Sequence, residues 1–146
     1  MAFNNPILGG GGFHHVCVKT RDWDRTMAFY CEVLGCVEKV AWRAAPQRAV
    51  MLDAGNDSLI EIFEDLAYAG AANGAILHFA LRTTKLDEIA ARVRATGAKI
   101  TMEPKDVTIP NTATGPHAVK GPVPIRIFFA EGPNGEIIEF FQHSLT

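Results

Sequence analysis

Eight short segments of this chain are strand-like runs rich in apolar residues, and in two of them apolar and polar residues alternate. In two longer segments the apolar residues recur every three or four positions. The short runs predict β-strands and the two longer segments predict amphipathic helices. The helices are expected over Asp22–Leu34 and Leu86–Ala95, each followed by a glycine that ends it. Asn134-Gly135 predicts a hairpin between the last two strands. The predicted strands cover residues 13–20, 37–43, 48–53, 58–64, 76–81, 99–103, 125–130 and 135–142.

The order of these elements repeats along the chain. A shift of 63 residues (78 − 15) aligns segment 76–83 with segment 13–20, and both segments end in a basic residue followed by Thr. Each segment precedes a predicted helix and three further strands. The chain is therefore expected to be an α+β protein of two tandem βαβββ modules, over about 13–65 and 75–142. A length of 146 residues suits a single domain spanning 1–146.

Two histidines and two glutamates occupy equivalent strands of the two modules. His15 and His78 lie in the first strand of each module, and Glu61 and Glu139 lie in the last. A lone His or Glu in a strand is more often solvated or hydrogen-bonded, but four at repeat-related positions favour a shared site. A carboxylate between large apolar residues is also costly unless it is paired or metal-bound. Two imidazoles and two carboxylates suit a divalent first-row metal.

Strand alternation places His15, Cys17 and Lys19 on one face of the first strand and Val16 and Val18 on the other. The valines are expected to pack under a helix, so His15 faces away from the helices. His14 falls on the valine face by the same alternation, and a structural role is therefore expected for it.

The second module is longer than the first in one place. The step from His to Glu is 46 residues in the first module (61 − 15) and 61 in the second (139 − 78). The additional residues fall within 104–124, which are rich in Pro, Gly, Thr and Asn. A loop of this length in a compact domain is usually functional or disordered, and we interpret it as a cover over the site. His117 and Lys120 within it are candidate substrate contacts.

Composition narrows the function classes. With 48% hydrophobic residues, 21% charged residues and a net charge of −2, the chain is an ordinary globular protein without the basic surface that nucleic acids or anionic membranes require. No apolar segment approaches the roughly 20 residues of a membrane span, and no secretory signal is present. Three cysteines without a Cys-x-x-Cys pair predict free thiols in a reducing cytoplasm.

Together these residues resemble the vicinal oxygen chelate superfamily, which includes glyoxalase I, bleomycin-resistance proteins, extradiol dioxygenases, fosfomycin-resistance enzymes and methylmalonyl-CoA epimerase. The resemblance covers about residues 13–142 and implies a curved, incomplete-barrel mixed sheet with the helices outside. It also implies a homodimer, with the site either within one chain or shared between two. Its markers are His15-Val with Asp22, Phe29-Tyr30-x-x-x-Leu34-Gly35, His78-Phe-Ala-Leu, and Gly132-Pro-Asn-Gly-Glu-Ile-Ile-Glu139.

The residue at position 61 helps to discriminate within the superfamily. Fosfomycin-resistance enzymes and extradiol dioxygenases have a His-His-Glu set, the epimerase typically has Gln at this position, and drug-sequestering bleomycin-resistance proteins generally lack the metal set. Short bacterial glyoxalase I has His, Glu, His, Glu, which His15, Glu61, His78 and Glu139 match.

The resemblance therefore implies a glyoxalase I-like (lactoylglutathione lyase-like) isomerase or lyase. Such an enzyme acts on an α-hydroxy-carbonyl or hemithioacetal through an enediolate, with Glu139 as main base and Glu61 as its counterpart. Ni²⁺ or Co²⁺ is favoured and Zn²⁺ follows, with glutathione or another thiol as cosubstrate.

Other positions bear on the substrate. Lys19 matches a glutathione-contacting basic residue of the family, and Phe63 and Phe141 lie beside the two glutamates as candidate substrate contacts. Asp65, next to Glu64, stands where the family often has Asn, and two acidic groups would repel a glutathione carboxylate. The alternatives are a metal-dependent dioxygenase, an acyl-CoA epimerase, and a non-catalytic protein that binds a small hydrophobic molecule.

Overall fold

The structure is a computed structural model that describes residues 3–33, 35–69, 74–131 and 137–143. Within these residues eight strands form one mixed sheet, and two short helical segments and one longer helix accompany it. The elements are β1 (Phe13–Thr20), α1 (Trp23–Met27), η1 (Ala28–Val33), β2 (Val37–Trp42), β3 (Ala49–Asp53), β4 (Leu59–Glu64), β5 (Ile76–Arg82), α2 (Leu86–Ala95), β6 (Ile100–Ile109), β7 (Val123–Glu131) and β8 (Ile137–Gln142).

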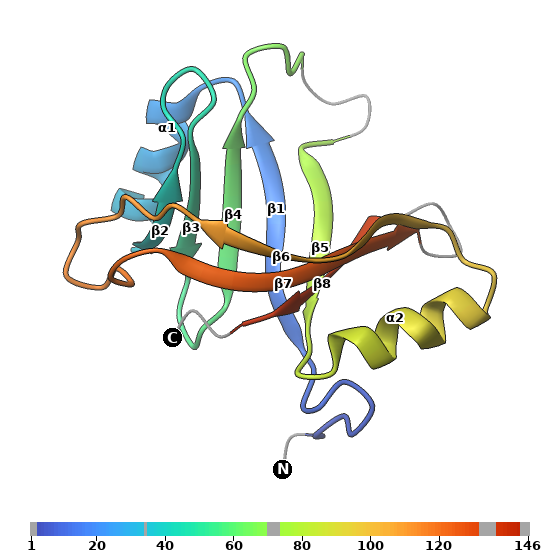
Figure 1. Cartoon of the computed structure of the whole chain (residues 1–146). Coiled ribbons are helices and arrows are strands. Elements are labelled where there is room, and N and C mark those ends of the chain that lie inside the picture. Colours follow the sequence, from blue (N-terminus) through green and yellow to red (C-terminus); the bar gives the residue numbers. More distant parts are fainter. Residues whose placement is uncertain (1–2, 34, 70–73, 132–136, 144–146) are drawn as a thin grey trace.

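The sheet joins the two modules side by side. Its strand order is β2-β3-β4-β1-β5-β8-β7-β6, so each module supplies four neighbouring strands. β1 pairs in parallel with β4 and antiparallel with β5, while β5 pairs in parallel with β8. Figure 1 shows the sheet curling so that β6 and β7 cross its inner side, with α1 and α2 outside. The predicted α+β class and the curved mixed sheet of two βαβββ modules are confirmed.

Apolar side chains bury both faces of the curled sheet. Outside, α1 and η1 pack on the first module and α2 packs on the second. Inside, one cluster draws on both modules, and burial of each large side chain in it stabilises the fold by about 1.5–3 kcal/mol. This shared inner cluster holds the modules in their curved arrangement. It contains Val40, Met51, Leu59, Ala80, Ile109, Val123, Ile125, Ile127 and Phe141.

The first helix differs in form from the one predicted over Asp22–Leu34. Asp22 caps it as expected, because its Oδ1 accepts a hydrogen bond of 3.1 Å from the backbone N–H of Arg25. After Met27 the chain continues as the π-helical segment η1 to Val33, and residue 34 lies outside the described residues. Apolar residues three to five positions apart remain on one side of either kind of turn, so the sequence pattern did not separate them.

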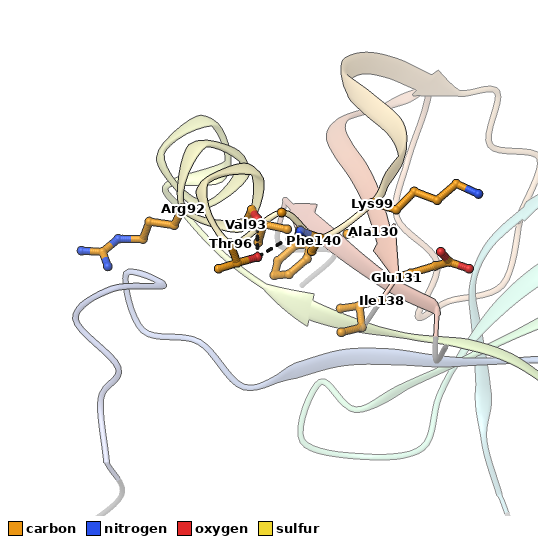
Figure 2. Close-up of a pocket in the computed structure, with 10 residues that line it drawn as sticks. Arg92, Val93, Thr96, Lys99, Ala130, Glu131, Ile138 and Phe140 are labelled. Carbon is orange, nitrogen blue, oxygen red and sulfur yellow. Dashed lines mark hydrogen bonds between the residues drawn. The ribbon is translucent and has the colours of Figure 1, made fainter. Parts of the chain in front are cut away.

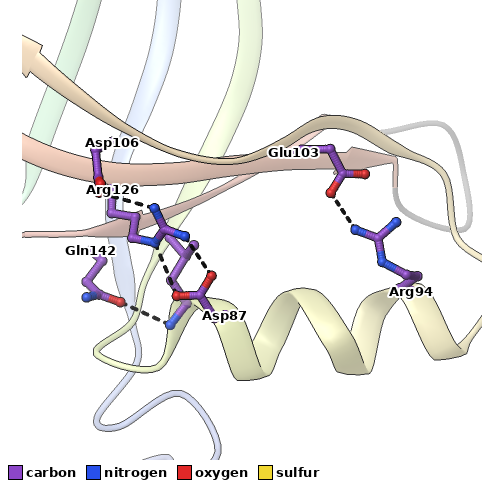
Figure 3. Close-up of polar contacts among 7 residues, drawn as sticks. Asp87, Arg94, Glu103, Asp106, Arg126 and Gln142 are labelled. Atoms are coloured by element: carbon purple, nitrogen blue, oxygen red, sulfur yellow. Dashed lines mark hydrogen bonds and ion pairs between the residues drawn. The ribbon is translucent and has the colours of Figure 1, made fainter.

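Polar contacts with β7 and β8 hold the second helix, α2, against the sheet, as Figure 3 shows. Its N-cap residue, Lys85, makes no side-chain cap, and Gln142 of β8 accepts the backbone N–H of Leu86 instead, at 3.0 Å. Arg126 of β7 donates to Asp87 at 2.8 Å. These contacts fix the N-terminal end of α2 against β7 and β8.

The predicted loop over 104–124 is wrong at both ends. β6 continues to Ile109 and β7 begins at Val123, which leaves residues 110–122 outside the strands. Pro104 lies within β6, on an edge strand and at a register shift in the pairing with β7, and both are places where a residue without an N–H is tolerated. The predicted Asn134-Gly135 hairpin lies outside the described residues.

Segment 110–122 closes the gap between the two edge strands, β6 and β2. The backbone N–H of Thr112 donates to the carbonyl of Ala41 at 2.7 Å, and that of Val119 donates to the carbonyl of Lys39 at 2.9 Å. Asn111 adds a side-chain bond, because its Oδ1 accepts the N–H of Ala41 at 3.2 Å. These bonds enclose the inner cluster on the side where the sheet is open.

Two expectations from composition can be compared with the structure. Cys17, Cys31 and Cys36 carry free thiols, as predicted. In the described part of the chain, no helix combines the length and the apolar character needed to cross a membrane.

Candidate metal centre

Glu61, Cys17 and His78 form one row of paired residues across three neighbouring strands, with Cys17 on β1 in the middle. Cys17 lies opposite Glu61 on β4 and opposite His78 on β5. Residues that pair across neighbouring strands project from the same face of a sheet, so Glu61 and His78 flank Cys17 on the inner face. Cys17 is fully buried, and its short side chain leaves space between its two longer neighbours.

The second row crosses β5 through Ala80. His15 lies opposite Ala80 in the β1–β5 pair, and Ala80 lies opposite Glu139 in the β5–β8 pair. Ala80 is the repeat equivalent of Cys17, since the two positions are 63 apart (80 − 17), and it is also fully buried. The two rows lie next to each other on the inner face and bring the four predicted residues into one group.

The ligand atoms of this group converge. His15 Nε2 lies 2.7 Å from Glu139 Oε2 and 3.5 Å from Glu61 Oε1. His78 Nε2 lies 3.0 Å and 3.4 Å from the same two oxygens, and the two Nε2 atoms are 3.2 Å apart. Ligands at about 2.1 Å from a common cation are about 3.0–3.4 Å apart, for right-angled to tetrahedral geometry. The group could therefore hold a divalent metal ion.

Burial supports the same conclusion. The exposed fractions of the four side chains are 0% for His15, 7% for Glu61, 10% for His78 and 6% for Glu139. Within the described residues Glu139 Oε2 is buried without an aligned hydrogen-bond donor, although both imidazoles are close to it. A buried carboxylate oxygen without an aligned donor gains from a positive charge beside it, and a cation at the shared point would supply such a charge.

The charges of the cation-free group follow from its contacts. Burial by itself would lower the pKa of His78, but the carboxylates of Glu139 and Glu61 outweigh burial and raise it to about 9. Burial would raise the pKa of Glu139, but the imidazoles of His15 and His78 outweigh burial and lower it. At neutral pH the cation-free group therefore carries a proton on His78 and an ionised carboxylate at Glu139.

Metal binding is expected to release about one proton per site between pH 7 and 8, because His78 must lose its proton to offer a lone pair. The raised pKa means that this proton stabilises the cation-free protein fully below pH 6.5, and that the stabilisation is lost as pH rises through about 9. Apparent metal affinity should therefore fall about tenfold for each pH unit below that value. Calorimetry in buffers of different ionisation enthalpy measures the released proton, and release of none at pH 7.5 would contradict this protonation state.

His14 is the functional neighbour that sequence reasoning missed. Phe13 lies opposite Leu81 and His15 lies opposite Ala80, so His14 is the additional residue of a bulge in β1. The bulge turns His14 inward, where its Nδ1 lies 2.9 Å from Nδ1 of His15. The expectation that His14 shares a face with Val16 and Val18 is wrong, because it assumed an unbroken alternation.

Two predicted substrate contacts are aromatic. Phe141 is buried, and its ring meets that of His15 edge-on, with centroids 5.3 Å apart, so it supports the histidine. Phe63 is half-buried, and the guanidinium of Arg43 lies 5.4 Å from its ring centroid. A third ring, that of Phe129, lies edge-on to His78 at 5.2 Å. Aromatic walls thus contact both histidines.

The other predicted substrate contacts are basic. The ammonium of Lys19 lies 4.9 Å from the ring centroid of Tyr68. His117 and Lys120 are exposed on segment 110–122. Contact between any of these three and a substrate stays a prediction.

Glu64 and Asp65 were expected to repel a glutathione carboxylate, but a neighbouring arginine balances the charge of Glu64. Arg48 donates to both carboxylate oxygens of Glu64, at 2.9 Å and 2.7 Å, and these bonds hold the pKa of Glu64 below its usual range. Asp65 Oδ1 accepts the backbone N–H of Ala67 at 3.0 Å. The charge of Glu64 is therefore balanced within the fold, which leaves Asp65 as the group that would face a glutathione carboxylate.

A cavity of about 740 Å³ lies away from the candidate metal centre, between the C-terminal end of α2 and strands β7 and β8 (Figure 2). Its apolar wall comes from Val93, Ala130, Ile138 and Phe140, all of which belong to the cluster that packs α2 on the sheet or border that cluster. None of the four clustered residues lines it, so it is not part of the centre.

The curled sheet with a buried His-Glu-His-Glu group at the junction of two modules agrees with comparisons to known proteins. The family model "Glyoxalase/Bleomycin resistance protein/Dioxygenase superfamily" matches residues 12–140, and the chain belongs to this superfamily. The uncharacterized protein YwbC of Bacillus subtilis (strain 168) is 31% identical over 137 residues, which cover 88% of this chain and 94% of YwbC. The superfamily resemblance predicted from the sequence is confirmed.

Solved structures show the same fold. The hypothetical protein BH1468 from Bacillus halodurans C-125 is similar with a TM-score of 0.66 and 17% identity, over 91% of this chain and 94% of that one. Methylmalonyl-CoA epimerase from Mycobacterium tuberculosis is similar with a TM-score of 0.63 and 22% identity, over 90% and 87% of the two chains. At these identities the likeness concerns the fold.

Proposed function

We propose that this protein is a metal-dependent enzyme that moves a proton between carbons beside a carbonyl, as in the glyoxalase I-like isomerisation of a hemithioacetal or another α-hydroxy-carbonyl. The observation that carries the proposal is the pair of buried carboxylates, Glu61 and Glu139, which belong to one group with both histidines. A divalent cation held by the four side chains, Ni²⁺ or Co²⁺ before Zn²⁺, would supply Lewis-acid polarisation of the substrate carbonyl.

Glu139 is the proposed main base. Its lowered pKa keeps the carboxylate ionised at neutral pH, so an oxygen is available to accept a proton. Glu61 lies in the other row of the group, where it would serve as the counterpart that takes or returns a proton on the neighbouring carbon. Burial of both carboxylates limits the exchange of a transferred proton with water.

The surroundings of the group suit a small, partly apolar substrate. The rings of Phe129 and Phe141 contact the two histidines and exclude water from them. Segment 110–122 joins the two edges of the sheet through its bonds to β2, and we propose that it covers the site. Substrate entry would then require these few bonds to open.

Metal removal provides the direct test. Purified protein is expected to contain about one divalent metal per chain by elemental analysis, and chelation should abolish turnover of the methylglyoxal–glutathione hemithioacetal. Readdition of Ni²⁺ or Co²⁺ should restore it, with Zn²⁺ less effective. Stoichiometric metal without turnover would move the search to other thiols, and turnover unaffected by a chelator would contradict a metal-dependent reaction.

An acyl-CoA epimerase is the second candidate, and the fold shared with methylmalonyl-CoA epimerase favours it. The same carboxylates would move a proton on the carbon beside a thioester. Exchange of solvent deuterium into methylmalonyl-CoA, without hemithioacetal turnover, would select this activity. Oxygen consumption that needs Fe²⁺ would select a dioxygenase, and tight binding without turnover would select a binding protein.

The quaternary structure is a separate expectation. A homodimer stays a prediction from the superfamily. The four residues of the candidate site come together within one chain, and this supports the proposal that each chain holds its own site.

A further inference from the structure

The buried imidazole of His14 has a defined place beside the candidate metal centre. Its side chain is held by the ring of Phe141, which stacks on it with centroids 4.0 Å apart and an interplanar angle of 29°. His14 is only 1% exposed. Its Nδ1 lies 2.9 Å from Nδ1 of His15, on the side of that ring that faces away from the clustered ligand atoms. The contact is therefore a hydrogen bond between two imidazoles, one of which is a proposed ligand.

The direction of this hydrogen bond follows from the other nitrogen of His15. Nε2 of His15 lies among the ligand atoms, 3.2 Å from Nε2 of His78 and 2.7 Å from Glu139, so it must offer its lone pair there to bind a metal. The proton of a neutral His15 ring is then on Nδ1, and His14 must accept it. His14 carries its own proton on Nε2, which is buried and has no hydrogen-bond partner within the described residues.

The electrostatics of the site agree with a neutral acceptor. His14 is buried and touches the imidazole of His15, so a positive charge on His14 would be disfavoured there. The neutral ring keeps the lone pair that an acceptor needs. A carboxylate in its place would add a third negative charge beside two buried glutamates.

We propose that His14 is a positioning residue, which holds His15 in the tautomer that has the proton on Nδ1 and leaves Nε2 free to ligate. The inference rests on the metal site of the proposed function. Ligating histidines usually donate their second N–H to a carboxylate, a backbone carbonyl or water, and such partners also fix the orientation of the ring. Here a neutral imidazole takes that place, and the bulge in β1 is what turns it inward.

The test compares two substitutions at this position. His14→Phe keeps a flat ring against Phe141 but removes the acceptor, whereas His14→Asn places a carbonyl oxygen at about the position of Nδ1. Titration of the purified protein with Co²⁺, followed by its visible absorption, should show a loss of about 10–100-fold in affinity for His14→Phe. His14→Asn should stay within about threefold of the unsubstituted protein. A loss of the same size in both variants would overturn the proposal.

A second measurement needs no variant. Imidazole ¹H–¹⁵N spectra of the Zn²⁺-loaded unsubstituted protein should show His15 protonated at Nδ1 and His14 protonated at Nε2, and the reverse assignment would overturn the inference. Thermal unfolding of the metal-free variants separates a change in stability from a change in affinity. Failure of the unsubstituted protein to bind Co²⁺ would refute the metal site itself, while equal Co²⁺ affinity in the unsubstituted protein and His14→Phe would refute only the role of His14.

Discussion

Replacing Glu139 by glutamine is expected to lower kcat for the hemithioacetal by about 10²–10⁴-fold, the usual contribution of a general base. Glutamine has nearly the shape of glutamate and fits the same space on β8, but its amide cannot accept a proton from carbon. The substitution also removes one of the two negative charges of the metal site, so metal content must be measured in the same sample. Glu139→Ala should be at least as severe.

Matched variants distinguish the loss of the catalytic base from a general effect of replacing a glutamate by glutamine. Glu88→Gln makes the same chemical change on the exposed side of α2 and should leave kcat unchanged. Glu61→Gln should reduce turnover as the counterpart. If metal-loaded Glu139→Gln turned over at the rate of the unsubstituted protein, Glu139 would not be the base, and the proposed mechanism would be wrong.

Truncation of Phe141 to alanine is expected to destabilise the protein by about 3–5 kcal/mol, because it empties a large volume in the inner cluster. Phe141 is 1% exposed and contacts both His14 and His15, so the loss extends to the metal centre. The free energy of unfolding in urea measures the first effect. Co²⁺ affinity under conditions where the variant remains folded measures the second, and it should fall by at least tenfold.

Phe128→Ala is the control for this variant. Phe128 is fully buried and stacks on Phe140 with centroids 4.4 Å apart, but it belongs to the cluster under α2 on the outer face. Its truncation should cost similar stability while leaving Co²⁺ affinity within about twofold. An equal loss of affinity in both variants would show that general destabilisation, and not support of the histidines, explains the result for Phe141.

Much of the fold could be predicted because regular elements leave regular patterns. β1 and α2 have the predicted bounds, and the other strands differ by one or two residues at their ends, except β6, which extends six residues (109 − 103) beyond its predicted end. The four clustered residues could be found because a His and a Glu recur at equivalent positions in both modules. Their distances could not be predicted, since they depend on how tightly the sheet curls around the inner cluster.

Three features were missed because contacts with residues distant in the sequence override the usual local pattern of a strand or a helix. His14 faces inward because a bulge interrupts alternation, and the bulge arises from the pairing of β1 with β5. β6 continues through Pro104 because its free edge tolerates a residue without an N–H. The cap of α2 comes from Gln142, 56 positions from the N–H that it accepts. Each becomes visible only when the strand order is known.

The ligand group lies at the junction of β1 and β5, where each module contributes one histidine and one glutamate. A single module carries half a ligand set, so neither module can complete the group without the other. Leu77 stands at the repeat equivalent of His14 and is 39% exposed, so of the two histidines in the group His15 has a buried imidazole partner at that position and His78 does not. The centre is therefore symmetric in its four clustered residues but not in the groups that contact them, so its two sides can take different chemical tasks.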